Sequence, residues 1–247
     1  MQELGLLFEE KMEEMYRKEL KELSEEQNPE QNADENESEE ELSIEDQIKQ
    51  ELSELKPKTN DDGSKIRKKD PLSFIDLNCE CVIFCKTRKP IVPEDFVKKI
   101  IEDLADPNDM QKRTRYVMKL TPITNSCNAT MEQFILLLNR VLAPHFHEAD
   151  KAEKSIKFAV DLTRRNFNTI ERMDLITQVV KQVIKDGKYK HVVDLKAYDK
   201  LILVECFKNN IGVSVVDGSF GSKYKKYNVQ QIFEAKMKAK DKQNEQK

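Results

Sequence analysis

The segment KLILVECFKNNIGVSVV, residues 200–216, has the most regular strand pattern of this chain. It contains two apolar runs, 200–208 and 211–216, that are rich in the β-branched residues favoured in strands. The runs are separated by Asn209 and Asn210, and asparagine tolerates the backbone of a two-residue hairpin turn. The segment therefore predicts two antiparallel strands joined by a tight turn.

The sequence around this hairpin predicts helices that alternate with strands. Residues 155–163 alternate apolar and polar side chains, which is typical of a strand with one solvent-exposed face. Asn128, Asn168 and Asn228 are placed to cap three amphipathic helices, and residues 191–195 predict a further strand. The order helix, strand, helix, strand, strand, strand and a final helix predicts an α+β domain.

A smaller unit precedes this domain. Residues 79–86, CECVIFCK, are almost wholly apolar and predict a strand that is covered on both faces. A helix with an apolar stripe opens at Pro93, and residues 113–120 predict another strand. Strand, helix and strand are too few to close a ferredoxin-like layer. The missing elements must come from elsewhere, and an amphipathic helix expected over residues 1–23 is the candidate.

Charge divides the chain into two parts. Residues 1–71 carry 23 acidic and 11 basic side chains, a net charge of −12, whereas residues 72–247 carry 23 and 31, a net charge of +8. Residues 24–54 contain thirteen acids and one lysine, and so we expect at least 24–41 to be disordered, with a short helix over 42–52. Because RNA is a polyanion, any RNA contact is expected in the second part.

The composition argues against several classes of protein. Of the 247 residues, 36% are charged and 38% apolar, and no run approaches the roughly 18 apolar residues that a membrane-spanning helix needs. The start of the chain lacks the pattern of a signal peptide, and so we expect an intracellular protein with no membrane contact. The six glycines form neither a dinucleotide-binding nor a Walker motif, which argues against nucleotide-driven chemistry.

Candidate catalytic and metal sites are weak. The spacing of Cys79, Cys81 and Cys85, without a second cluster, is poor for zinc, and buried free thiols are expected instead. His145 and His147 have no acidic partner at ligand spacing and are expected in a loop. No catalytic serine or paired-carboxylate motif occurs in the folded part. We therefore expect no catalytic residues, no metal and no cofactor.

Two basic segments are candidates for RNA contacts. Arg164, Arg165 and Asn166 lie between a strand and a helix N-terminus, where a phosphate could bind, although solvated loop arginines are the alternative. The segment GSFGSK, residues 218–223, is expected to be a flexible loop rather than a phosphate loop. Lysines and tyrosines then interleave, a mixture that neutralises phosphates and stacks on unpaired bases. Exposed lysines with partly buried tyrosines would give the same pattern. These residues are Lys223, Tyr224, Lys225, Lys226 and Tyr227, and Lys157 adds a cation on the outward face of the strand over 155–163.

Four segments resemble the THUMP domain of the adaptor proteins that serve RNA cytidine acetyltransferase in tRNA acetylation. They are LTPITNSC (120–127), VDLTRRNFNTIERMDLI (160–176), VVDLKAYDKLILVECFKNNIGVSVV (192–216) and KYNVQQIF (226–233). The similarity covers about residues 78–234. The residues that match the family's basic segment after its first THUMP strand are Arg164, Arg165 and Asn166, and those that match its segment after the sheet are Lys226, Tyr227 and Asn228.

The resemblance implies a partial ferredoxin-like N-terminal domain followed by a THUMP domain, in which helices pack on a mixed sheet, with an acidic disordered insertion. The expected divisions are 1–23, a helix of the ferredoxin-like domain; 24–71, a linker; 72–122, the rest of that domain; 123–217, the THUMP domain; and 218–247, a loop, a helix and a polar tail. The family's N-terminal domain begins with an apolar strand, whereas this chain begins within the following helix. We therefore expect either a truncated N-terminus or a half-domain completed in another way.

The resemblance also implies a function. It is that of a non-catalytic adaptor that grips the 3′ acceptor end of serine and leucine tRNAs, while a separate RNA cytidine acetyltransferase modifies a cytidine of the D-arm. DNA is not an expected partner, and the expected location is the nucleus or nucleolus, with the cytoplasm as the alternative. Two other functions stay open. One is an RNA-modifying enzyme with the same module, for which the roughly thirty residues after Asp217 leave no room. The other is an RNA-independent protein scaffold.

Overall fold

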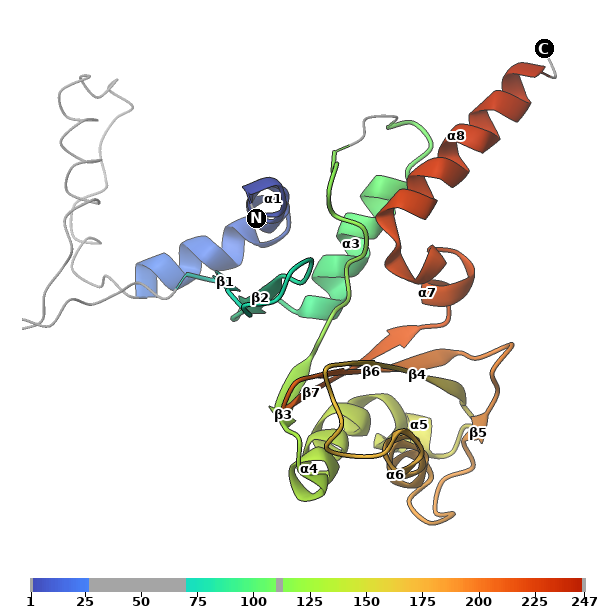
Figure 1. Ribbon diagram of the computed structural model, residues 1–247. Coiled ribbons are helices and arrows are strands. Elements are labelled where there is room, and N and C mark those ends of the chain that lie inside the picture. The colour runs from blue at the N-terminus through green and yellow to red at the C-terminus, as the bar shows by residue number, and fades with distance from the viewer. Residues whose placement is uncertain (1, 27–69, 110–112, 246–247) are drawn as a thin grey trace, which may run out of the picture. The chain divides into compact units, whose positions relative to one another are not determined.

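The computed structural model describes residues 2–26, 70–109 and 113–245 (Figure 1). The chain divides into two compact units. Unit 1 comprises Met1–Met15 and Val92–Lys247, and unit 2 comprises Tyr16–Ile91. The helix predicted over 42–52 and most of the segment predicted to be disordered lie outside the described residues.

A five-stranded mixed sheet forms the middle layer of unit 1 (Figure 1). Its strands, in spatial order, are β3 (Asn125–Asn128), β7 (Asn210–Asp217), β6 (Lys200–Phe207), β4 (Lys157–Arg165) and β5 (Val192–Val193). Strand β4 runs parallel to β5 and β6, whereas β7 is antiparallel to β6 and β3. The predicted hairpin is present, but its turn lies one residue earlier, at Lys208 and Asn209, where Lys208 adopts a φ of 49°.

Helices cover both faces of this sheet (Figure 1). On one face lie α4 (Met131–Leu142), the π-helical turn η2 (Ala143–His147), α5 (Ala149–Ala152) and α6 (Arg172–Ile184). On the other lie α3 (Pro93–Ala105), α7 (Ser219–Ser222), the 3₁₀ turn η3 (Lys225–Tyr227) and the first turns of α8 (Val229–Glu245). The predicted α+β fold, with helices packed on a mixed sheet, is confirmed. None of the described helices combines the length and the apolar character that crossing a membrane requires.

The main core lies between the sheet and α4 and α6. Even-numbered residues of β4 and β6, including Phe158 and Val204, point into it, because successive side chains of a strand alternate between its two faces. The apolar stripes of both helices face them. The cap of α4 is Thr130, whose hydroxyl accepts a hydrogen bond from the Gln133 amide at 3.4 Å, and not the predicted Asn128, which belongs to β3. Helix α6 likewise begins after Glu171 rather than Asn168.

The second face of the sheet is also buried over much of its area, which corrects the prediction of a solvent-exposed face for the strand at 155–163. Ala159 is 3% exposed, and Leu201 and Leu203 of the neighbouring strand are 3% and 2% exposed. Strand β4 is internal to the sheet, and helices on the second side exclude water from its middle. Its fully exposed residues, Lys157, Arg164 and Arg165, therefore lie at its two ends, while Asp161 in the middle of the strand is half-buried.

Helix α1 (Gln2–Glu26) extends beyond the predicted range of 1–23 and has a non-helical backbone at Tyr16, where the two units divide. Within unit 1 its first part packs on α3, and the rings of Phe8 and Phe96 meet edge to face with centroids 5.3 Å apart. Lys11 is 6% exposed, and its ammonium group pairs with the Asp103 carboxylate at 2.8 Å. An apolar and an ionic contact thus tie this helix to unit 1.

In unit 2, β1 (Leu72–Ile75) and β2 (Phe84–Thr87) form an antiparallel pair. The strand predicted over 79–86 is wrong for its first five residues. Cys81 adopts a left-handed backbone, with φ of 61°, which a strand does not allow, and this thiol is exposed rather than buried. In unit 1, the predicted strand at 113–120 is reduced to a single bridge, between Lys119 and Asn228, in the part that the structure describes.

The segment GSFGSK contains a helical turn, α7, and not the predicted flexible loop. Phe220 within it is fully buried and packs on the Tyr227 ring, with centroids 4.5 Å apart. Tyr198 crosses the turn so closely that a side chain at Gly218 would overlap the Tyr198 carbonyl oxygen, and one at Gly221 would overlap the Tyr198 hydroxyl. Gly218 is therefore required by its close approach to backbone, whereas a side chain at Gly221 would have to displace the Tyr198 side chain.

Replacing Gly221 by alanine should lower the free energy of unfolding by about 1–3 kcal/mol, because the added methyl group overlaps the Tyr198 hydroxyl. Tyr198→Phe should restore most of this loss, since the nearest remaining ring atom would lie 3.5 Å from the methyl group. Urea unfolding of the wild type, both single variants and the double variant measures the coupling. Equal losses with and without the Tyr198 hydroxyl would contradict this account of the packing.

Candidate nucleic-acid interface

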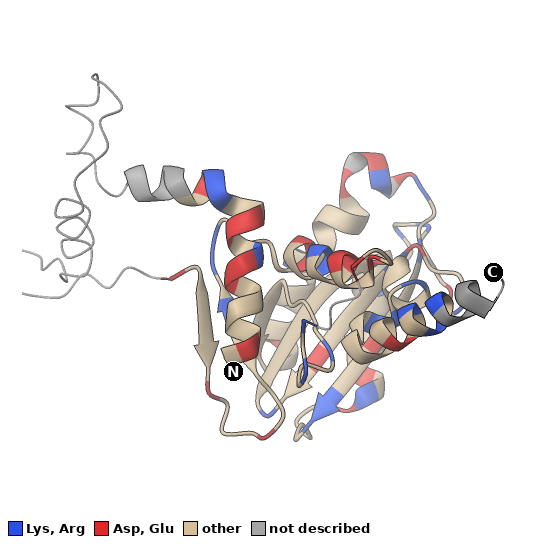
Figure 2. Ribbon diagram, turned by 90° about the horizontal axis from the view of Figure 1, so that it is seen from above, with Lys and Arg blue, Asp and Glu red and all other residues tan. Residues whose placement is uncertain are grey.

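The two predicted arginines end strand β4, whose arrowhead is blue in Figure 2. Both are exposed, but the ladder with β6 stays regular to Arg165, and so the pleat directs their side chains to opposite faces of the sheet. Arg164 lies on the α6 side, where its guanidinium donates to the Ile170 carbonyl oxygen at 3.3 Å. Arg165 lies on the other face. This differs from the prediction that the two guanidiniums act together on one phosphate.

The N-terminus of α6 is already occupied by acidic residues. Asn166 is exposed and adopts a φ of 51°, where the chain leaves the strand. Glu171 is the cap residue of the helix, and Asp174 lies in its first turn. Because carboxylates at a helix N-terminus interact favourably with its dipole, they compete there with any phosphate. The helix end therefore adds little to an anion site beside Asn166.

Arg165 instead joins a cluster of charged side chains on the second face of the sheet, which we call the outer-face cluster. Its members are Lys119, Asp161, Thr163, Arg165, Glu205 and Lys226. The Lys226 ammonium group pairs with the Asp161 carboxylate at 3.0 Å. Glu205 accepts a hydrogen bond from Thr163 and interacts favourably with Lys119 and Arg165. Three cations and two carboxylates from four distant segments thus meet beside the carboxyl end of β4.

Burial sets the ionisation of Glu205. Desolvation raises the pKa of its carboxyl group, while Lys119, Thr163 and Arg165 act in the opposite direction and Asp161 adds to the rise. Sequence reasoning missed both Glu205 and Lys119. One signal was present, because Glu205 is the only charged residue in the interior of the apolar run 201–207. A carboxylate in such a position requires nearby cations or hydrogen-bond donors.

An unusual backbone places Lys226 in this cluster. Lys225, Lys226 and Tyr227 are three consecutive left-handed residues, with φ of 51°, 54° and 56°. Each such residue costs about 1–2 kcal/mol for a side chain other than glycine, and so the turn must be held by its surroundings. Tyr227 is 2% exposed, and its carbonyl oxygen accepts a hydrogen bond from the Leu120 amide at 3.2 Å. The buried tyrosine anchors the turn, and both lysines remain exposed.

The tyrosines of this segment belong to the core. Tyr224 is 5% exposed, its ring contacts that of Tyr227, and burial raises the pKa of the Tyr227 phenol. Neither ring is available to stack on a base, and so exposed lysines with buried tyrosines, the simpler of the two interpretations, describe this segment. Lys223 is exposed, with its ammonium group 4.9 Å from the centre of the Tyr224 ring. Asn228 caps α8 by accepting the Gln231 amide at 2.9 Å, as its spacing predicted.

Lys157 lies apart from these residues. It begins β4, and at 3.3 Å per residue its backbone is about 26 Å from that of Arg165 at the other end of the strand. Its ammonium group pairs with the Asp194 carboxylate at 3.2 Å. The structure therefore brings Arg165 and Lys226 together and separates Lys157 from them.

His147, His191 and Cys206 are occupied in packing. His147 belongs to η2 rather than to a loop, and its Nε2 donates to the Val183 carbonyl oxygen at 3.1 Å, while burial lowers the pKa of its ring. His191 is buried between the Phe146 carbonyl oxygen, at 2.9 Å, and the Ile156 amide. Burial raises the pKa of the Cys206 thiol to about 11. No group of three potential ligands that could hold a metal ion occurs among the described residues.

The fold and the sequence define a THUMP-domain protein, since the model of the THUMP domain matches residues 128–216. The tRNA acetyltransferase TAN1 of Saccharomyces cerevisiae is 62% identical over 241 residues, which cover 96% of this chain and 81% of that protein. An uncharacterized protein of Schizosaccharomyces pombe is 31% identical over 190 residues, covering 77% and 59% of the two chains. THUMP domain-containing protein 1 of Bos taurus is 24% identical over 189 residues, covering 76% and 48%. The chain belongs to the family of TAN1 and THUMP domain-containing protein 1, as the resemblance predicted.

The outer-face cluster predicts a pH-dependent affinity for RNA. As the pH falls through the raised pKa of Glu205, protonation removes a negative charge from the cluster, and so affinity for tRNA should rise. Glu205→Gln should remove this part of the pH dependence and strengthen binding at pH 7 by about fivefold, for roughly 1 kcal/mol of repulsion. Fluorescence anisotropy with labelled tRNA between about pH 5 and pH 7 checks this.

The control variant is Glu132→Gln, which removes an exposed carboxylate from α4 on the other side of the sheet. It should leave both the affinity and its pH profile close to those of the wild type. Equal effects of the Glu132 and Glu205 substitutions would show that only the total charge of the protein matters.

Proposed function

We propose that this chain is a non-catalytic tRNA-binding adaptor that presents tRNA to a separate RNA cytidine acetyltransferase for N4-acetylcytidine formation. One observation carries the proposal, namely the 62% identity, over 96% of this chain, to a protein named tRNA acetyltransferase TAN1. The THUMP domain at 128–216 provides the module for RNA binding. Serine and leucine tRNAs are the proposed substrates, bound through their 3′ acceptor end, as the family resemblance implies.

The chemistry of the described side chains supports the adaptor role over the catalytic one. A thiol with a pKa of about 11, such as Cys206, is almost entirely protonated at neutral pH and is a poor nucleophile. His147 of η2 donates to the Val183 carbonyl oxygen, and His191 donates to the Phe146 carbonyl oxygen of η2. Both hydrogen bonds hold η2 against its neighbours. These groups are committed to the fold, and so acetyl transfer is assigned to the partner enzyme.

Electrostatics supports RNA as the ligand of the THUMP part. Residues 72–247 carry a net charge of +8, which attracts any polyanion regardless of its sequence. The candidate contacts retained for RNA are exposed cations. Arg165 and Lys226 belong to the outer-face cluster, and Lys225 precedes Lys226 in the same turn. Arg164 lies on the α6 side of the sheet, and Lys223 lies over the Tyr224 ring. We further propose that 72–122 and the first helix form the partial ferredoxin-like domain, and that the THUMP domain holds the RNA. The proposed location is the nucleus or nucleolus.

A reconstitution separates an adaptor from an enzyme. Purified chain, a purified RNA cytidine acetyltransferase, or both are incubated with a serine tRNA transcript, ATP and labelled acetyl-CoA, and acetylcytidine is mapped by mass spectrometry. We expect acetylcytidine in tRNA only when both proteins are present. Acetylation by the chain alone would contradict the non-catalytic role, and full acetylation by the acetyltransferase alone would contradict the need for an adaptor.

A matched variant tests whether the adaptor acts through RNA. Arg165→Ala combined with Lys226→Ala should reduce acetylation and tRNA affinity together, because it removes two cations of the outer-face cluster. Lys18→Ala with Lys86→Ala removes the same charge from exposed positions of unit 2 and serves as the control. Loss of acetylation with unchanged tRNA affinity would favour a protein scaffold instead.

A further inference from the structure

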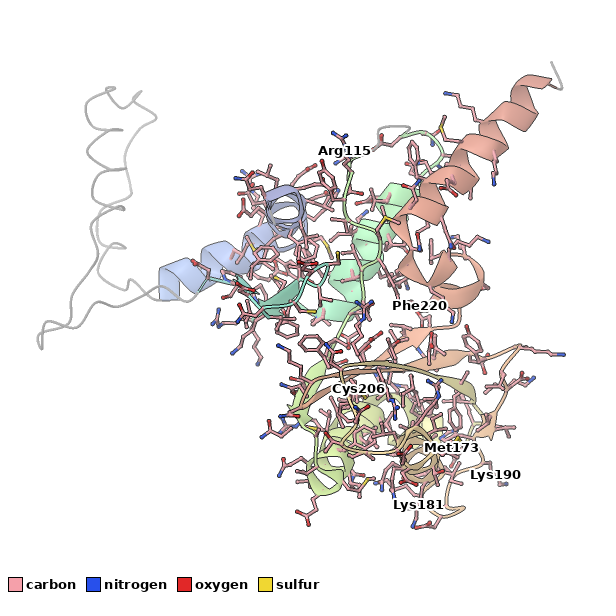
Figure 3. All side chains as sticks on the ribbon, in the orientation of Figure 1. Arg115, Met173, Lys181, Lys190, Cys206 and Phe220 are labelled. Atoms are coloured by element: carbon pink, nitrogen blue, oxygen red, sulfur yellow. The ribbon has the colours of Figure 1, made fainter. Side chains whose placement is uncertain are left out.

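A second group of exposed lysines lies at the C-terminal end of α6, on the side of the sheet that carries this helix, where Figure 3 labels Lys181 and Lys190. We call it the α6-end cluster. Its members are Lys154, Lys181, Lys185, Lys188 and Lys190, and all except Lys154 come from one stretch of ten residues. The neighbouring acids are Glu153 and Asp186, which leaves a local net charge of +3.

Ion pairing distinguishes this cluster from three other lysines of unit 1 that lie on or beside the sheet. Lys157, Lys200 and Lys226 each pair with a carboxylate at 3.2 Å or less. In the α6-end cluster, the Lys181 ammonium group lies 3.9 Å from the Asp186 carboxylate. Within the described part of the chain, the other four lysines form no ion pair. A lysine that already has a carboxylate partner must give it up to bind a phosphate. These four lysines can bind a phosphate without that cost.

The backbone that carries these lysines is well ordered by its contacts. Lys185, Asp186 and Gly187 have left-handed backbones, with φ of 43°, 54° and 90°, and end the helix. The Lys185 amide donates to the Lys181 carbonyl oxygen, and the Tyr189 amide donates to the Ile184 carbonyl oxygen. The next segment is tied to the start of β4, because the Ser155 hydroxyl donates to the Lys190 carbonyl oxygen at 2.7 Å. The cluster is therefore presented on a fixed surface.

Aromatic rings support the same surface. The Tyr189 ring stacks on that of His147, with centroids 4.6 Å apart and planes 18° apart, and on that of His191 at 5.7 Å. The Lys188 ammonium group lies 5.5 Å from the centre of the Tyr189 ring. The stack fixes Tyr189, and so the backbone positions of the exposed Lys188 and Lys190 on either side of it are fixed as well.

The helix dipole explains only part of the cluster. Cations near a helix C-terminus are favourable, and this accounts for Lys181 and Lys185 in and just after the last turn of α6. The effect fades beyond one turn. Lys188 and Lys190 follow the helix, and Lys154 comes from a different segment, so the dipole does not account for them.

We propose that the α6-end cluster is a second RNA-contact surface that binds backbone phosphates of the tRNA. It lies beside the start of β4, because β5 begins two residues after Lys190 and pairs with Lys157. The outer-face cluster lies toward the other end of that strand. The proposal rests on the proposed function, since it assigns the same RNA a second set of contacts. The RNA then spans at least the roughly 26 Å between the two ends of β4.

The test is the salt dependence of tRNA binding by the full chain. Lys185, Lys188 and Lys190 are replaced together by glutamine, and a labelled tRNA transcript is titrated between about 50 and 200 mM salt. We expect the slope of log affinity against log salt to flatten by about 2–3, because each phosphate contact contributes roughly 0.7–0.9. The control changes Lys18, Lys86 and Lys89, all exposed in unit 2, to glutamine and should leave the slope unchanged. Thermal melting of each variant verifies the fold.

The outcomes separate this inference from the proposed function. If the wild type binds tRNA and the α6-end variant has the same salt slope as the wild type, the α6-end cluster does not contact RNA, while the adaptor role stands. Equal flattening by both triple variants would also overturn it, because only total charge would matter. If the wild type binds no tRNA, both proposals fail. Poly-glutamate provides a last comparison. If it displaces tRNA from the wild type at equal charge concentration and does not bind the α6-end variant, the α6-end cluster is a binding surface for an acidic protein and the inference is wrong.

Discussion

The parallel pairing of β4 with β6 determines which side chains of these two strands face each side of the sheet. It places β4 inside a sheet that is covered on both faces, and the alternation of side chains then assigns each residue of β4 to one core or the other. Phe158 and Leu162 must face α4 and α6, and so Arg165 must face the opposite side, beside Glu205 and Lys226. The position of the charged groups is thus a consequence of core packing.

The sequence was informative where periodicity and composition act locally. The runs 200–208 and 211–216 predicted the central hairpin, because apolar β-branched residues fit only buried strands there. The apolar run 79–86 was misread, because a left-handed residue at Cys81 breaks the extended backbone. Periodicity also failed for 113–120, whose conformation is set by contacts with distant segments such as the carbonyl oxygen of Tyr227.

The sequence identified basic residues of the candidate RNA interface but not their arrangement in space. Basic residues were identified at 164–165 and 223–226, but the pleat separates the two arginines, and burial removes the tyrosines from the surface. Glu205 and Lys119 enter the outer-face cluster only through tertiary contacts, which a linear pattern does not record. The α6-end cluster became informative once ion pairs were known, since lysines with and without a carboxylate partner are identical in sequence.

We infer that the THUMP domain holds tRNA on exposed cations at both ends of β4. Hydrogen exchange of the full chain, with and without a tRNA transcript, tests it most directly, because it reports the backbone segments that RNA covers. We expect slower exchange in 185–190, in 164–168 and in 223–228, with little change in β1 and β2 of unit 2. Protection confined to unit 2, or no protection at saturating tRNA, would contradict it.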